Sequence, residues 1–291
     1  MQEIIIGSRG SDLALWQAHH VKTLLENLHC KVSIKIIQTQ GDKIQNLSFD
    51  KLEGKGFFTK EIELELIEKK IDLAVHSHKD LETTTPKGLI VAAVSDREDP
   101  SELLLINKTS VDSQKKWDLK EKAIIGTSSA RRKSLIKAFR ADLQIEELRG
   151  NVPTRIQKLR EQKYDAILLA KAGVSRLNLD LSSFHVLTLN PREFVPAPAQ
   201  GVLALQIRQG ETALFELLQK LNNSKVAQTI AIERGVLNQM QGGCQLPLGV
   251  YCEDNQVFVS YSKSSQNAAL FFSFPVEKEI IKKIVAKLNS L

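Results

Sequence analysis

A short apolar run passes directly into a polar turn and a helical pattern in AIIGTSSARR, residues 123–132. The same succession recurs in QIEELRGNVPTR at residues 144–155 and in AILLAKAGVSR at residues 166–176. Strands that each lead into a helix are typical of α/β units with a parallel sheet. We therefore expect an α/β lobe in this part of the chain.

An earlier part of the chain has a similar pattern. Apolar strands are expected at residues 3–6, 72–75 and 89–94, and alternating apolar residues indicate a half-buried strand at residues 32–36. A helix is expected from residue 59 to residue 70. These elements indicate a second α/β lobe, which precedes the first in the sequence.

Two segments interrupt the patterns and indicate crossovers between the lobes: residues 95–101, which contain Pro100, and residues 194–201, which contain Pro196 and Pro198. From about residue 211, we expect helices, a glycine-rich loop, two strands and a final amphipathic helix. The predicted domains are residues 1–97 with 195–212, residues 98–194, and a small α+β domain at residues 213–291.

The composition is that of an ordinary globular protein, with 291 residues of which 42% are hydrophobic and 25% are charged. A net charge of +6 permits an anionic ligand, and an aromatic content of 5% leaves few rings for stacking on nucleic acid bases. The sequence shows neither a signal-peptide pattern nor an apolar run long enough to span a membrane. We therefore expect a cytoplasmic protein with no nucleic-acid partner and no membrane partner.

Arginines follow the strands of the lobe at residues 98–194, where helices are expected to begin. They are Arg131, Arg132, Arg149, Arg155 and Arg176. Free backbone N–H groups at a helix start, a hydroxyl such as that of Thr127 or Ser129, and a guanidinium can together bind a carboxylate or a phosphate. Solvated surface arginines are the alternative, although three successive strand ends argue against it. Because these turns lack GxxxxGK[ST] and GxGxxG, we expect carboxylates as the ligands.

The lobe at residues 1–97 shows a comparable basic pattern. SRGS at residues 8–11 follows its first strand, and Lys51 and Lys55 lie in a polar, glycine-bearing stretch at residues 38–58. In HSHKD, residues 76–80, an acid follows a base at the end of a buried strand, which favours an electrostatic role for Asp80. A metal site at the two histidines is the weaker alternative, because no further ligand lies at a known spacing, and we expect none.

The three cysteines, Cys30, Cys244 and Cys252, are too few and too scattered for a disulfide framework. Cys244 differs from the other two because GGCQLP at residues 242–247 places two glycines before it and a proline after it. The residues alone leave open whether Cys244 is functional or an inert buried thiol.

Taken together, these motifs resemble the hydroxymethylbilane synthase family, also called porphobilinogen deaminase, along nearly the whole chain. The similar stretches are SRGSDLALWQA at 8–18, GKGFF at 54–58, HSHKD at 76–80, GTSS at 126–129, LRGNV at 148–152, PAQG at 198–201 and GGCQ at 242–245. The resemblance implies an α/β fold of two lobes like type II periplasmic binding proteins, with mixed, mostly parallel sheets, and a small α+β C-terminal domain.

The resemblance also implies a transferase of tetrapyrrole (heme) biosynthesis that needs no metal. In the family, porphobilinogen loses ammonia to give a methylene-pyrrolenine cation, which the terminal pyrrole of the growing chain attacks. A dipyrromethane cofactor, joined to a cysteine by a thioether, primes this chain. Hydrolysis then releases the linear tetrapyrrole hydroxymethylbilane. We expect a monomer with porphobilinogen as its small-molecule partner.

By position in these motifs, Asp80 is the expected catalytic residue and Cys244 the cofactor attachment site. The expected cofactor-binding residues are Lys79, Asp80, Thr127, Ser128, Ser129, Arg131, Arg132, Arg149 and Gly150. The expected substrate-binding residues are Arg9, Ser11, Lys51, Lys55, Phe58, Arg149, Arg155, Arg176 and Gln200.

The chain departs from the family pattern beside these positions. His78 stands where methionine is common, Ala130 where leucine is common, and Lys171 where a small or apolar residue is frequent. None of these departures removes a charge that the mechanism needs. The main alternative function is that of a non-catalytic binding protein for a small polycarboxylate, which leaves Cys244 unexplained.

Overall fold

The computed structural model describes residues 3–39, 59–243 and 245–291. The expectations for Lys51, Lys55, Phe58 and Cys244 lie outside these residues. The chain divides into two compact units, and each is described by itself. Unit 1 comprises residues 1–45, 54–98 and 200–231, and unit 2 comprises residues 46–53, 99–199 and 232–291.

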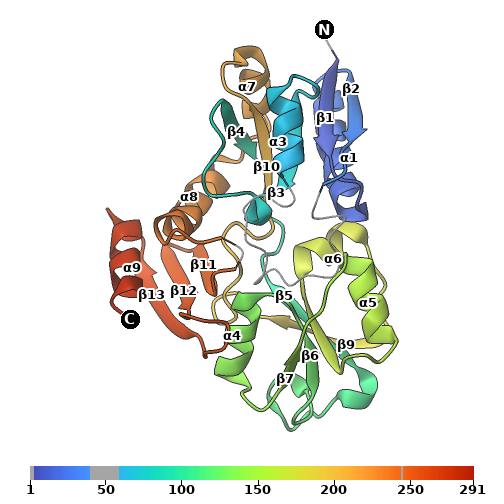
Figure 1. Ribbon diagram of the computed structural model, residues 1–291, viewed down its shortest axis with the longest axis vertical. Coiled ribbons are helices and arrows are strands. Elements are labelled where there is room, and N and C mark those ends of the chain that lie inside the picture. The colour runs from blue at the N-terminus through green and yellow to red at the C-terminus, as the bar shows by residue number, and fades with distance from the viewer. Residues whose placement is uncertain (1–2, 40–58, 244) are drawn as a thin grey trace. The chain divides into compact units, whose positions relative to one another are not determined.

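Unit 1 contains a five-stranded sheet with the order β2-β1-β3-β10-β4 (Figure 1). β1 is parallel to β2 and β3, whereas β10 runs antiparallel to β3 and β4. The elements are β1 (Ile4–Ser8), α1 (Asp12–Asn27), β2 (Val32–Ile36), α3 (Lys60–Ile67), β3 (Leu73–Ser77), the 3-10 helix η2 (His78–Asp80), β4 (Leu89–Val94), β10 (Leu203–Arg208) and α7 (Thr212–Gln219).

The alternation of side chains along a strand gives this sheet two apolar faces. On one face, Leu73 and Val75 of β3 join a core with residues of α1 and α7. On the other face, Ala74 packs with Ile62 and Leu66 of α3. Helices thus cover both faces, and the carboxyl ends of the parallel strands remain available for polar residues.

Unit 2 contains a second five-stranded sheet, with the order β7-β6-β8-β5-β9. β6 is parallel to β7 and β8, whereas β5 is antiparallel to β8 and β9. The elements are β5 (Glu102–Asn107), the 3-10 helices η3 (Lys108–Ser110) and η4 (Lys116–Asp118), β6 (Ile124–Gly126), α4 (Ala130–Phe139), β7 (Gln144–Glu146), α5 (Val152–Arg160), β8 (Ala166–Ala170), α6 (Lys171–Leu177) and β9 (Phe184–Leu189). Residues of α4 join the core on one face, and those of α5 and α6 join the core on the other.

Unit 2 also includes a three-stranded antiparallel sheet with the order β11-β12-β13. Its core joins the end of α8 and the final helix α9 through residues such as Val236 and Ile284. The elements are α8 (Ser224–Gln239), which crosses the boundary between the units, β11 (Leu248–Glu253), β12 (Gln256–Tyr261), β13 (Leu270–Pro275) and α9 (Ile280–Asn289).

The α/β class with mixed sheets is confirmed, and antiparallel pairing is more extensive than expected. The sequence patterns predicted neither β5 nor β10, the two strands that introduce it. Among the described residues, no helix combines the length and the apolar character that crossing a bilayer requires.

Candidate functional site

The topology of unit 1 brings five of the predicted site residues to one edge of its sheet, here called the unit-1 edge. Because β1 and β3 are parallel neighbours, their carboxyl ends lie at this edge. Antiparallel β10 begins there, since Leu203 pairs with Ser77 at the end of β3. The residues that adjoin these strand ends are Arg9, Ser11, Lys79, Asp80 and Gln200.

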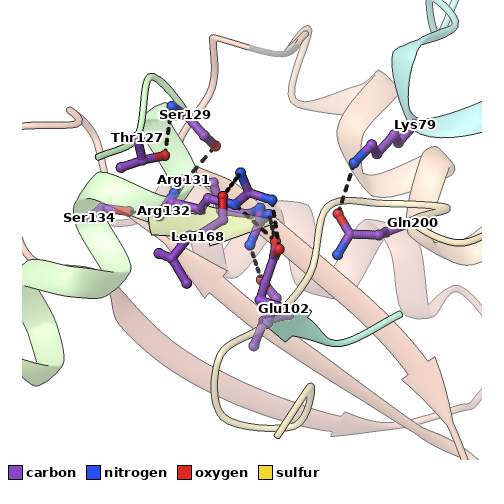
Figure 2. A network of polar contacts seen from close by, with 10 residues as sticks. Lys79, Glu102, Thr127, Ser129, Arg131, Arg132, Ser134, Leu168 and Gln200 are labelled. Atoms are coloured by element: carbon purple, nitrogen blue, oxygen red, sulfur yellow. Dashed lines mark hydrogen bonds and ion pairs between the residues drawn. The ribbon is translucent and has the colours of Figure 1, made fainter. Parts of the chain in front are cut away.

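A hydrogen bond joins two of these residues. The Nζ of Lys79 donates to the Oε1 of Gln200 at 3.2 Å (Figure 2). Gln200 is buried, and its carbonyl oxygen accepts a hydrogen bond from the Nε of Arg97 at 3.0 Å. Asp80, in contrast, is exposed in η2. The unit-1 edge therefore presents a carboxylate to solvent beside a lysine that has a fixed partner.

The backbone turn at Gln200 explains why the chain needs PAQG here. Ala199 and Gly201 have φ values of 61° and 90°. A Cβ at Gly201 would lie 2.2 Å from the carbonyl oxygen of Glu98, so any larger residue would displace the backbone. The turn places Gln200 shortly before β10, where its side chain accepts the hydrogen bond from Lys79.

Ser11 is the N-cap of α1, but its side chain makes no capping hydrogen bond. The hydroxyl is thus not required by the helix terminus, which usually takes such a group. This arrangement is compatible with the predicted role of Ser11 in binding a substrate carboxylate.

A buried polar chain lies in the same sheet. The Nε2 of His76 is 2.9 Å from the Oε1 of Gln206, and the Nε2 of Gln206 donates to the Oε1 of Glu63 at 2.9 Å. Burial lowers the pKa of His76 from 6.5 to about 4, although the hydrogen bond with Gln206 acts in the opposite direction. At neutral pH His76 is therefore an uncharged imidazole that links β3 to β10.

The topology of unit 2 gathers polar groups at a second edge, here called the unit-2 edge. β6, β7 and β8 are parallel, and their carboxyl ends lead to Thr127, Ser128, Ser129, Arg131, Arg132, Arg149 and Gly150. The Oγ of Ser128 donates to the carbonyl oxygen of Leu148 at 2.9 Å and accepts from the backbone N–H of Leu148 at 3.1 Å. This pair of bonds joins the ends of β6 and β7.

Ser129 is the N-cap of α4. Its Oγ accepts from the backbone N–H of Arg132 at 3.4 Å, while its own N–H donates to the Oγ1 of Thr127 at 3.3 Å. The turn therefore satisfies part of the hydrogen-bonding capacity of the helix start by itself.

Arg131 and Arg132 are buried and already bind a carboxylate within the protein. The Nη2 of Arg131 donates to the Oε1 of Glu102 at 2.5 Å, and the Nη2 of Arg132 donates to the Oε2 of Glu102 at 2.6 Å (Figure 2). Burial lowers the pKa of Arg131, whereas the charge of Glu102 raises it. The two arginines are thus held in a buried cationic cluster and are not solvated surface side chains.

The segment after β7 orients two further predicted residues. Gly150 has a φ of 114°, and a Cβ there would lie 2.7 Å from the Cγ2 of Thr154. Asn151 caps α5 by accepting the N–H of Thr154 at 2.9 Å, and the Nε of Arg155 donates to the carbonyl oxygen of Gly150 at 2.8 Å. Arg155 is therefore attached to the loop that carries Arg149.

Arg176 lies in the last turn of α6, not at its start, where the strand-end pattern predicts it. The sequence patterns also did not reveal Glu102, the first residue of β5. An acid that opens the apolar run ELLLI at residues 102–106 was the available signal, because a charge next to a buried strand needs a partner. Among the described residues, no group of three or more metal-ligating side chains occurs.

Comparison with known proteins identifies the family of this chain. The family model described as porphobilinogen deaminase, dipyromethane cofactor binding domain, matches residues 4–216. The chain belongs to the porphobilinogen deaminase family. A porphobilinogen deaminase of Syntrophomonas wolfei subsp. wolfei is 46% identical over 257 residues, which are 87% of this chain and 81% of that protein. One of Sulfurimonas denitrificans is 40% identical over 253 residues, 86% of this chain and 79% of that protein. The resemblance inferred from the motifs is thus confirmed.

Likeness to solved structures is remote. A Salmonella typhimurium periplasmic binding protein described for its high arginine specificity is 12% identical, with a TM-score of 0.42 over 79% of this chain and 98% of that chain. The sheet topology, not this likeness, supports the fold class.

Membership of the porphobilinogen deaminase family identifies the chain as a transferase with a dipyrromethane cofactor, in agreement with the sequence prediction. The unit-2 edge fits such a group. Dipyrromethane carries acetate and propionate side chains, and this edge holds the guanidinium groups of Arg131 and Arg132, whose two positive charges share the single carboxylate of Glu102. A carboxylate-bearing ligand would balance the remaining charge.

Proposed function

We propose that this chain acts as a hydroxymethylbilane synthase, which removes ammonia from porphobilinogen and joins the units head to tail. The observation that carries this proposal is the match of the porphobilinogen deaminase family to residues 4–216, which include Asp80 at the unit-1 edge. Asp80 contributes an exposed carboxylate at the carboxyl end of a buried strand, where ligands of open α/β sheets bind.

Asp80 is proposed to act electrostatically. When the C–N bond of porphobilinogen breaks, ammonia leaves and the remaining fragment carries a positive charge that its pyrrole nitrogen shares. A carboxylate near this nitrogen stabilises the charge as it develops, and such stabilisation is worth about 3 to 4 kcal/mol in other enzymes. Lys79 is kept beside this position by its hydrogen bond with Gln200.

The basic residues are proposed to bind the carboxylates of the pyrroles. Each ring carries an acetate and a propionate, so every added ring brings two negative charges. At the unit-1 edge, Arg9, Ser11 and Gln200 are the proposed substrate-binding residues. In unit 2, Arg149 at the unit-2 edge, Arg155 in α5 and Arg176 in the last turn of α6 are proposed for this role, because a guanidinium pairs with a carboxylate through two parallel hydrogen bonds.

The residues proposed to bind the cofactor are Lys79, Asp80, Thr127, Ser128, Ser129, Arg131, Arg132, Arg149 and Gly150, with Cys244 as its covalent attachment site. When bound, dipyrromethane supplies the free pyrrole α-carbon from which the product chain grows. Arg131 and Arg132 would orient its carboxylates, and the hydroxyl of Ser129, at the start of α4, would add a neutral donor. Lys51, Lys55 and Phe58 complete the proposed substrate-binding set.

The three predicted domains, with boundaries at residues 97/98, 194/195 and 212/213, remain part of the proposal. We further propose that the protein is a cytoplasmic monomer that acts on a small molecule and binds neither nucleic acid nor membranes. Among the described residues, neither Cys30 nor Cys252 forms a disulfide, which agrees with the proposed reducing compartment. Light scattering of the purified protein tests the monomer, and a molar mass of twice the sequence value would contradict it.

The mass of the intact protein tests the proposed function. The purified chain should exceed its sequence mass by one dipyrromethane unit, and Cys244→Ser should abolish both this excess and the conversion of porphobilinogen. Cys30→Ser is the matched control, because Cys30 lies in unit 1 outside the proposed site, and it should retain both properties. An active enzyme of unmodified mass would refute the attachment. Binding of porphobilinogen without its consumption would instead indicate a carboxylate-binding protein.

A further inference from the structure

Glu102 occupies an unusual position for an acidic residue. It opens β5, and it pairs in register with Ala170, the last residue of β8. Because β5 is antiparallel to β8, the amino end of β5 lies at the edge where the parallel strands end. The strand thus delivers a carboxylate to the unit-2 edge, among the arginines proposed to bind the cofactor.

The carboxylate of Glu102 contacts both guanidinium groups. Its Oε1 accepts from the Nη2 of Arg131 at 2.5 Å and from the Nε of Arg132 at 3.2 Å, and its Oε2 accepts from the Nη2 of Arg132 at 2.6 Å. The Glu102 side chain is 0% exposed, and those of Arg131 and Arg132 are 6% and 7% exposed. Arg132 therefore makes a two-point contact that fixes the plane of its guanidinium.

Each arginine has a second anchor on the backbone. The Nη1 of Arg131 donates to the carbonyl oxygen of Val195 at 2.8 Å, and the Nη1 of Arg132 donates to the carbonyl oxygen of Leu168 at 3.0 Å. A guanidinium has five N–H donors, so these contacts leave donors on both residues for a ligand. The two guanidinium groups are thus held in place, but their hydrogen-bonding capacity is only partly used.

Electrostatics explain why a carboxylate is needed. Two neighbouring arginines in the first turn of α4 repel each other and the positive end of the helix dipole. The charge of Arg132 lowers the pKa of Arg131, as burial does, whereas the charge of Glu102 raises it. Without Glu102, hydration of the two guanidinium groups would favour conformations in which both side chains turn toward solvent.

From these contacts we infer that Glu102 is a positioning residue for the cofactor. It sets the planes of the Arg131 and Arg132 guanidinium groups so that their remaining donors meet the carboxylates of dipyrromethane. This inference rests on the proposed function, because it assumes that these arginines bind the cofactor. Glu102 itself is expected to stay buried and to touch neither cofactor nor substrate.

The test compares Glu102→Gln with Glu102→Asp and with Asp165→Asn as the control. Asp165 precedes β8, at the opposite end of the same strand, and accepts hydrogen bonds from Ser110 at 2.5 Å and from the backbone N–H of Ile124 at 2.8 Å. It is thus a structural carboxylate of unit 2 away from the arginines. For each purified variant, intact mass gives the fraction that carries the cofactor, urea denaturation gives the stability, and initial rates give KM for porphobilinogen.

Glu102→Gln should lower the ratio of modified to unmodified protein about tenfold relative to Asp165→Asn, after comparison at equal stability, since one charge-assisted hydrogen bond is worth roughly this factor. Glu102→Asp keeps the charge but shortens the side chain, and it should be intermediate. Equal loading of Glu102→Gln and Asp165→Asn would overturn the inference. Greater loading of Glu102→Gln would also overturn it, because it would show that Glu102 competes with the ligand. If Glu102→Gln does not fold, the same comparison with Glu102→Asp decides.

Arg149→Leu separates this inference from the proposed function. Arg149 follows β7, whereas the two guanidinium groups that Glu102 binds come from α4, so Arg149→Leu keeps all three of these hydrogen bonds. Normal loading and turnover of both Arg149→Leu and Arg131→Leu would contradict the proposed function. Defects in both arginine variants together with normal loading of Glu102→Gln would contradict only the positioning role.

Discussion

The two five-stranded sheets share a topological feature, but the residue that it places beside the basic side chains is neutral in one sheet and anionic in the other. In each, an antiparallel strand brings a polar residue to the edge where the parallel strands end. In unit 1, the turn that enters β10 brings the neutral Gln200, which accepts a hydrogen bond from Lys79. In unit 2, β5 brings the anionic Glu102, which binds Arg131 and Arg132. The topology thus places one residue beside the ends of the parallel strands, and the charge of that residue determines how it interacts with the basic side chains there.

Because of this difference, one carboxylate remains exposed and can interact with a ligand, whereas the other is buried in an ion pair. The unit-1 edge keeps Asp80 exposed, and the buried His76 in the same sheet is uncharged at neutral pH. The unit-2 edge uses its buried carboxylate internally to keep the arginines in place. We therefore expect substitutions at the unit-1 edge to affect catalysis more than stability, and those in the Glu102 cluster to affect both.

The largest effect on stability is expected for Arg131→Leu. Removal of one partner leaves Glu102 partly uncompensated in a buried site, which costs about 3–5 kcal/mol in the free energy of unfolding. Urea denaturation measures this loss. Arg155→Leu, which removes a partly exposed guanidinium from the same unit, is the control and should change stability by less than about 1 kcal/mol. Equal effects of the two substitutions would show that the buried cluster contributes little.

Asp80→Asn should lower kcat by about 10²- to 10³-fold, equivalent to about 3–4 kcal/mol, because the amide cannot stabilise a developing positive charge. The exposed position of Asp80 predicts almost no change in stability. Steady-state rates, intact mass and urea denaturation check these expectations together. Asp96→Asn, an exposed carboxylate of unit 1 that binds Asn223, should retain normal rates. Near-normal turnover of Asp80→Asn would remove this residue from the mechanism.

The sequence predicts parallel strands such as β1, β6 and β7 well because each of these ends at a polar turn that starts a helix. The same pattern locates Lys79, Asp80, Arg131, Arg132 and Arg149 close to strand ends, but Arg176 lies in the last turn of α6. It does not predict β5, because the short apolar run at residues 103–106 has no period that distinguishes a buried strand from a buried helix, and it does not predict β10. Neither run carries a signal for strand direction. The partnership of Glu102 depends on that direction, so residue types and spacing alone do not reveal it. The roles assigned to individual site residues remain predictions.

His76 makes stability depend on pH in unit 1. Its pKa of about 4 in the folded protein lies below the ordinary value of 6.5, so the unfolded chain binds a proton first as the pH falls. The contribution of the neutral imidazole is complete above pH 6.5 and is lost progressively down to about pH 4, by a total of about 3 kcal/mol. Unfolding free energies measured across this range should lose this slope in His76→Gln. The exposed His19 is the control, and His19→Gln should keep the slope. A wild-type slope in His76→Gln would assign the pH dependence to other groups.

The smallest effect distinguishes the two serines at helix N-cap positions, Ser129 at the unit-2 edge and Ser11 at the unit-1 edge. Ser129 accepts the N–H of Arg132, so Ser129→Ala should lower the free energy of unfolding by about 1 kcal/mol. Ser11 makes no such bond, so Ser11→Ala should leave stability within about 0.5 kcal/mol of the wild type. Urea denaturation of the two variants, made in the same background, gives both values. If Ser11→Ala raises KM for porphobilinogen while stability is unchanged, its hydroxyl serves a ligand rather than the helix. Equal losses of stability would show instead that both hydroxyls cap their helices, and the unit-1 edge would then resemble the unit-2 edge in this respect.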